Sequence, residues 1–135
     1  MTVFQFIYIS LLSTTAMSLF SLLLGAILGK PMLEPYWLNA VILHKKTIKH
    51  GLGWILHYTA GLGFLYILMG LEPWLTSLPA FNMLWAGLLE GLMGIGMWQV
   101  LFWLAHKPEN LPLLTYYINL LIAHIVFAAV ALSMF

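Results

Sequence analysis

The chain lacks cysteine and arginine, and its 135 residues include only five lysines and four glutamates as charged side chains. The absence of cysteine excludes disulfides, thiolate metal sites and cysteine nucleophiles. So few basic side chains also leave a nucleic-acid-binding surface without support. The chain therefore belongs to none of the classes that depend on thiol chemistry or on an extended charged surface.

Catalytic motifs are missing as well. No serine or threonine nucleophile has a recognisable catalytic setting, and no glycine-rich phosphate loop precedes a helix. Glu34, Glu72 and Glu109 fall in predicted loops, so we expect no paired carboxylates for acid–base catalysis. The sequence favours neither an ordinary hydrolase nor a transferase, and whether the protein is an enzyme stays open.

What the chain does contain is apolar sequence, since 63% of its residues are hydrophobic and 7% are charged. A soluble domain of this size has no core large enough to bury so much apolar surface. Four apolar runs, at about 4–29, 51–71, 83–105 and 113–135, each exceed the ~20 helical residues that cross a bilayer. They lack the alternation of barrel strands. The sequence predicts an all-α membrane protein in which residues 1–135 form a single transmembrane four-helix domain.

The lysines indicate how the four spans are oriented. Lys30, Lys45, Lys46 and Lys49 separate the first two runs, and Lys107 separates the last two. The positive-inside rule then places both loops in the cytoplasm and both termini outside. The first run has no basic n-region and no small-x-small cleavage site, so we expect it to be retained as a helix.

The connection 31–50 is predicted to contain an amphipathic helix lying in the membrane interface. Its apolar positions 37, 38, 41, 42 and 48 fall on one face, with Asn39 and the lysines mostly off that face. The lysines would then touch anionic headgroups, although positive charges beside a span often serve only to orient it. The second connection, around Glu72-Pro73-Trp74, is predicted to be a loop.

Three ionisable side chains, His57, Glu90 and His124, interrupt three different apolar runs. A charged side chain in hydrocarbon costs at least ~2.5–3.5 kcal/mol, so such groups usually face a partner, a cavity or a ligand. Counted at ~1.5 Å per residue, they lie about 20, 10 and 16 Å below the outer surface, respectively. His124 is thus the middle step and can reach either neighbour.

Several roles are compatible with this arrangement. His57 and His124 could hold a haem b if their depths were nearly equal, and His57, Glu90 and His124 could bind a transition metal if helix tilt brought them together. A proton relay or hydrogen-bonded network tolerates staggered steps. The histidines could also be structural, each hydrogen bond contributing ~0.6 kcal/mol to helix association. No HExxH or ExxH motif selects among these roles.

Gly87 and Gly91 in the third run have the GxxxG spacing that lets helices approach closely in lipid. Packing within the bundle is the expected role. A face for self-association is the alternative.

The Trp54-x-x-His57 pattern, the Gly87-xxx-Gly91 spacing, and His124 followed by an apolar run together resemble a group of small four-helix bacterial membrane proteins. This resemblance implies a multi-pass protein of the bacterial inner (plasma) membrane and singles out the two histidines. It names no reaction and does not include Glu90.

Two functional hypotheses follow. The first is a small membrane protein whose buried His/Glu site binds a metal, a haem or a protonatable network. The second is a non-catalytic accessory or assembly subunit of a larger membrane complex. Membrane lipids are the expected partners in both, and a homo-oligomer is compatible with either.

Overall fold

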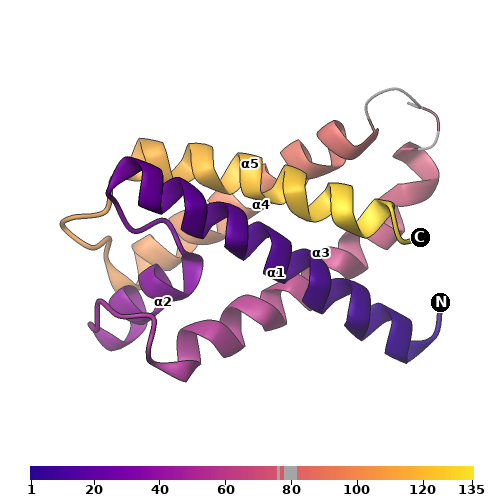
Figure 1. Cartoon of the computed structure of the whole chain (residues 1–135). Coiled ribbons are helices and arrows are strands. Elements are labelled where there is room, and N and C mark those ends of the chain that lie inside the picture. Colours follow the sequence, from indigo (N-terminus) through magenta and orange to yellow (C-terminus); the bar gives the residue numbers. More distant parts are fainter. Residues whose placement is uncertain (76, 78–81) are drawn as a thin grey trace.

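The computed structural model consists of five α-helices and describes residues 1–75, 77 and 82–135. The helices are α1 (Val3–Leu28), α2 (Glu34–Leu43), α3 (Gly51–Leu75), α4 (Asn82–Ala105) and α5 (Leu113–Leu132), as Figure 1 shows. All but α2 are long and apolar enough to cross a membrane. The all-helical prediction is therefore confirmed over the described ranges, which contain no strand.

The predicted ends of the apolar runs agree with the helix ends to within four residues. One connection was predicted wrongly, because Glu72, Pro73 and Trp74 belong to the last turns of α3. Leu75, which follows them, is buried in the core, and its packing favours continuation of the helix. A proline close to a helix end disrupts fewer hydrogen bonds than one in the middle.

The long helices run alternately up and down, so the two chain termini lie at the same end of the bundle (Figure 1). α5 packs against both α4 and α1, and α1 also packs against α3. α3 and α4 meet over a much smaller surface, and the short α2 packs against α3 beside this gap. The bundle is consequently open along one seam, between α3 and α4.

The seam between α4 and α5 is closed by glycines. A Cβ atom on Gly87 would meet the backbone of Ile125, and one on Gly91 would lie 2.9 Å from Leu121 Cα. Such an approach is available only to residues without a side chain. The predicted packing role of the GxxxG pair is confirmed.

α1 presents an unusual buried face, because many of the side chains it turns inward are hydroxylic. Its N-terminus is closed by a capping box between Thr2 and Gln5, and Gly29, with φ 64°, ends it in the left-handed conformation. The buried hydroxyl residues between these ends are Ser10, Ser13, Thr14, Ser18 and Ser21. A polar stripe thus faces α3 and α5 along one helix.

α2 differs from the helix predicted for this connection, because it is short and packs inside one end of the bundle. Trp37 and Val41 are buried against apolar residues from α4 and α5. Asn39, predicted to lie off the packed face, is only 1% exposed. Its amide donates to the carbonyls of Thr47 (2.8 Å) and His50 (3.0 Å), and its Oδ1 accepts from Gly53 N–H at 2.9 Å. Asn39 therefore joins α2 to the start of α3.

Candidate functional site

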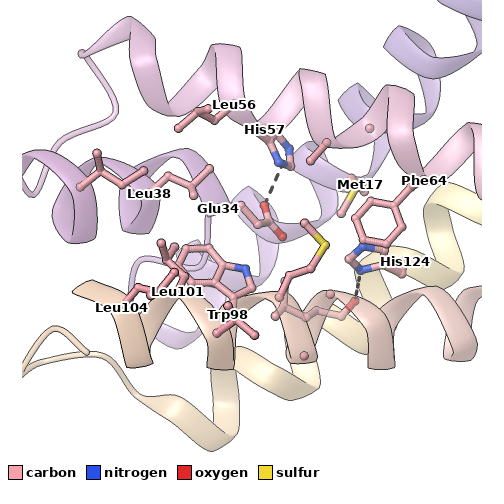
Figure 2. A pocket seen from close by; sticks show the side chains of 18 residues that line it. Met17, Glu34, Leu38, Leu56, His57, Phe64, Trp98, Leu101, Leu104 and His124 are labelled. Atoms are coloured by element: carbon pink, nitrogen blue, oxygen red, sulfur yellow. Dashed lines mark hydrogen bonds and ion pairs between the residues drawn. The ribbon is translucent and has the colours of Figure 1, made fainter. Parts of the chain in front are cut away.

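A cavity of about 650 Å³ occupies the open seam between α3 and α4. α2 borders it toward the lysine-bearing end, and side chains from α1 and α5 form its floor. Its walls are almost entirely apolar; Trp98 and Leu101 come from α4 and Phe64 from α3 (Figure 2). Among the ionisable side chains of the described residues, those that line it are Glu34, His57 and His124.

His57 is held by a chain of hydrogen bonds to α1. The hydroxyl of Ser18 donates to the carbonyl of Thr14 at 2.7 Å, and His57 Nε2 lies 2.8 Å from the same hydroxyl oxygen. Because the Ser18 proton is already used, Nε2 of His57 must carry the proton and donate to Ser18. In the neutral ring Nδ1 is then the unprotonated nitrogen.

Glu34 approaches His57 from the first turn of α2. Its Oε2 lies 4.0 Å from His57 Nε2, and the two side chains point toward each other in Figure 2. Its Oε1 accepts a hydrogen bond from Ser21 at 3.2 Å, and Ser21 accepts one from the Asn119 amide at 3.1 Å. One polar network thus links α1, α2, α3 and α5.

Glu34 is almost completely buried and belongs to α2, outside the four candidate spans. Burial raises the pKa of Glu34 to about 7, while the hydrogen bonds from its own backbone N–H and from Ser21 act in the opposite direction. The carboxyl group therefore exchanges its proton near neutral pH. This is the chemistry expected of a buried acid beside an imidazole.

The prediction that Glu34 is a loop residue was wrong. The signal was present, because an acidic residue followed by Pro35 is a typical beginning of a helix. What the sequence did not reveal is that the α1–α2 turn folds back so that Glu34 faces the spans. Among the described residues, it provides the carboxylate beside a histidine that was expected of Glu90.

His124 lies at the other end of the cavity. Its Nδ1 is 2.7 Å from the carbonyl of Leu120, which can only accept, so Nδ1 carries the proton and Nε2 is a free acceptor in the neutral ring. The ring packs edge-on against Phe64, with 4.7 Å between ring centroids. Its other edge faces Gly94, where a Cβ atom would lie only 3.0 Å from Cε1.

Glu90 does not line this cavity. It is fully buried in α4, and neither of its carboxyl oxygens has a hydrogen-bond partner among the described residues. The structure thus brings His57 and His124 to one cavity and leaves the third predicted ligand outside it. Over the described ranges, no three His, Asp or Glu side chains are grouped closely enough to hold a metal ion. Metal or haem binding by these residues stays a prediction.

The three ionisable side chains of the cavity present two acceptor nitrogens and one carboxyl group that can donate or accept a hydrogen bond. His124 offers an unprotonated nitrogen, His57 offers Nδ1 in the neutral ring, and Glu34 can either donate or accept according to its protonation. All three side chains are nearly buried, so a polar group of a ligand would meet them with little competition from water. The cavity can therefore accommodate an apolar molecule, and its side chains can form hydrogen bonds with the polar end of that molecule.

Comparisons with family models, with curated proteins and with solved structures found no match to the chain. The resemblance based on Trp54, His57 and His124 gains no support from them.

Proposed function

We propose that the protein is a multi-pass membrane protein that binds a lipophilic molecule carrying a hydroxyl group in the cavity between α3 and α4. The observation that carries this proposal is the combination of a largely apolar cavity of about 650 Å³ with three nearly buried ionisable side chains. Ligand sites are commonly apolar clefts of ~300–1,000 Å³ with a few convergent polar groups.

Access from the membrane supports this assignment. Met97, Val100 and Leu104 line the cavity and are also exposed on the outer surface of α4. If the four long helices cross a bilayer, this rim faces lipid, and an apolar ligand enters sideways without crossing water. The hydroxyl group of the ligand then reaches His124 on the buried side of the cavity.

The protonation pattern supports a hydroxyl group in particular. His124 Nε2 has no hydrogen-bond partner among the described residues and can only accept in the neutral ring. A hydrogen bond from a ligand hydroxyl to this nitrogen would add about 0.5–1.5 kcal/mol to binding. A ligand with ether oxygens alone would leave this nitrogen unsatisfied.

The Glu34–His57 pair gives the site a second property, the exchange of a proton. Glu34 titrates near neutral pH, and Ser21 and Ser18 connect the two side chains to α1. The pair forms the protonatable network of the proposed site, with the lysine-bearing end in the cytoplasm of a bacterial inner membrane.

A second candidate function is supported by the open seam itself. α3 and α4 pack against each other over little surface, and large apolar side chains are exposed on both. A helix of a partner protein could cover this seam and fill the cavity with its side chains. The protein would then be an accessory subunit of a larger membrane complex.

Photo-crosslinking distinguishes the two. The probe is a dodecanol with a diazirine near the end of its chain, added to the protein in phosphatidylcholine vesicles. We expect one adduct per protein, mapped to the α3, α4 and α2 residues that line the cavity. Unlabelled dodecanol should compete, whereas dodecyl methyl ether, which has no hydroxyl proton, should compete at least about tenfold less well, equivalent to one lost hydrogen bond.

The control variants are His124→Leu, which removes the acceptor in the cavity, and His106→Leu, which changes an exposed histidine at the end of α4. Labelling should fall in the first and persist in the second. Labelling spread over all lipid-facing helices, or equal competition by the alcohol and the ether, would contradict the proposal.

A further inference from the structure

A second cavity, of about 510 Å³, lies on the other side of α2, at the lysine-bearing end of the bundle. It is bounded by the last turns of α1, by the turn that leads into α2, and by the segment 47–49 before α3. Of the residues that line it, Ser21 belongs to the polar network described above, and the carbonyl of Met32 accepts a hydrogen bond from Asn119 of that network at 3.3 Å. Its lining thus differs from that of the cavity between α3 and α4.

The polar wall of this cavity is basic. Lys30, two residues after α1, and Lys49, in the segment before α3, both line it, and the lining contains no carboxylate. Neither lysine forms an ion pair with any acidic side chain in the described part of the chain. The hydroxyl-bearing residues Tyr36 and Thr47 lie in the same lining. Two unpaired ammonium groups beside hydroxyl donors are suited to a phosphate group.

The remaining wall is apolar and follows α1. Ala26 and Leu22 line the cavity one and two turns before Lys30, and Leu22 is 49% exposed. Gly25 lies between them, where a Cβ atom would be 2.7 Å from the carbonyl oxygen of Lys30, so the turn after α1 folds tightly back on the helix. A basic floor and an apolar side wall thus meet at the end of a candidate span. Phospholipid headgroups occupy this level of a bilayer.

We propose that this cavity is a binding site for one anionic phospholipid. Its phosphate lies between Lys30 and Lys49, and an acyl chain lies along Leu22 and Ala26. The lipid would join the end of α1 to the segment 47–49, which the sequence separates by the whole of α2. This site is independent of the ligand proposed for the α3–α4 cavity.

The chain supplies its own matched control. Lys45 and Lys46 belong to the same connection and carry the same charge, but they do not line the cavity. The double variants Lys30→Gln/Lys49→Gln and Lys45→Gln/Lys46→Gln therefore lower the net charge equally. All four lysines are exposed, so both variants should fold, which circular dichroism checks.

Native mass spectrometry of the detergent-solubilised protein measures the binding of phosphatidylglycerol and phosphatidylcholine. We expect one tightly bound phosphatidylglycerol in the wild type and in Lys45→Gln/Lys46→Gln, and at least about tenfold weaker binding in Lys30→Gln/Lys49→Gln. Glycerol 3-phosphate, which has the headgroup phosphate without acyl chains, should not displace the lipid at equal concentration.

Three results would overturn the proposal. Equal weakening in the two double variants would show that the lysines attract anionic lipid only through their summed charge. Equal binding of phosphatidylcholine would show that the phosphate site does not select negative lipid. Displacement by glycerol 3-phosphate would identify a soluble phosphate ester as the ligand instead of a lipid.

Discussion

Replacing Gly87 with alanine should force α4 away from α5. The added Cβ atom would lie 2.7 Å from the backbone nitrogen of Ile125, whereas favourable contacts between such atoms are about 3.5–4.0 Å. Both backbones are fixed by helical hydrogen bonds, so a side-chain rotation cannot relieve the overlap. The two helices have to separate along the seam that the glycines close.

Overpacking of this kind costs roughly 1–3 kcal/mol, and alanine returns up to about 1 kcal/mol through its higher helix propensity. The free energy of unfolding of Gly87→Ala should therefore fall by about 1–2 kcal/mol. Gly96 is the matched control on the same helix, because a Cβ atom there would meet nothing within 4 Å. Gly96→Ala should be neutral or more stable by up to about 1 kcal/mol.

Unfolding in mixed dodecyl sulfate and dodecyl maltoside micelles, followed by tryptophan fluorescence, measures both variants against the wild type. The reasoning would be refuted if Gly87→Ala were as stable as the wild type, or if Gly96→Ala lost as much stability as Gly87→Ala. The first result would mean that α4 and α5 do not approach at Gly87. The second would mean that any added methyl group on α4 is harmful.

Other predictions concern the cavity and its supports. Asn39→Ala should lower the free energy of unfolding by roughly 1–3 kcal/mol, because the buried N–H of Gly53 and the carbonyls of Thr47 and His50 lose their partner. Asn110→Ala in an exposed turn should change it by less than about 0.5 kcal/mol, and the same micelle titration checks both. Because burial raises the pKa of Glu34 from 4.5 to about 7, the folded state binds this proton more tightly than the unfolded state does. This contribution to the free energy of unfolding is fully present below pH 4.5 and decreases by about 3 kcal/mol in total as pH rises to about 7. The free energy of unfolding of Glu34→Gln, measured across the same pH range, should lack this decrease. Gly94→Ala places a Cβ atom 3.0 Å from Cε1 of His124, so dodecanol-probe labelling should fall several-fold while the unfolding free energy changes by less than about 1.5 kcal/mol.

Much of the helical framework could be predicted from the sequence. The four long helices follow from the length of the apolar runs, since hardly any charge interrupts them. The close approach of α4 to α5 follows from the spacing of Gly87 and Gly91. His57 and His124 were singled out because an ionisable group in an apolar run has few places to go except the interior.

The partner of His57 could not be predicted by the same reasoning. Glu34 stands outside the apolar runs, where a carboxylate usually faces water, and only the fold of the α1–α2 turn brings it to His57. Asn39 was misplaced for a related reason. The sequence pattern shows which face of α2 is apolar, but not that Asn39 is buried by bonding to the start of α3. Depth along the spans suggested Glu90 as a neighbour of the histidines, but Glu90 lies one turn before Gly94, the first α4 residue that lines their cavity.

The most direct test of the proposed cavity site is native mass spectrometry of the protein extracted from its host membrane, comparing the wild type with His124→Leu. One lipophilic, hydroxyl-bearing molecule should accompany the wild type at a ratio near one to one. It should be lost from the variant, while the anionic phospholipid is retained. If both proteins carry the same molecules, or if the wild type carries a phospholipid alone, the cavity between α3 and α4 is not the ligand site described here.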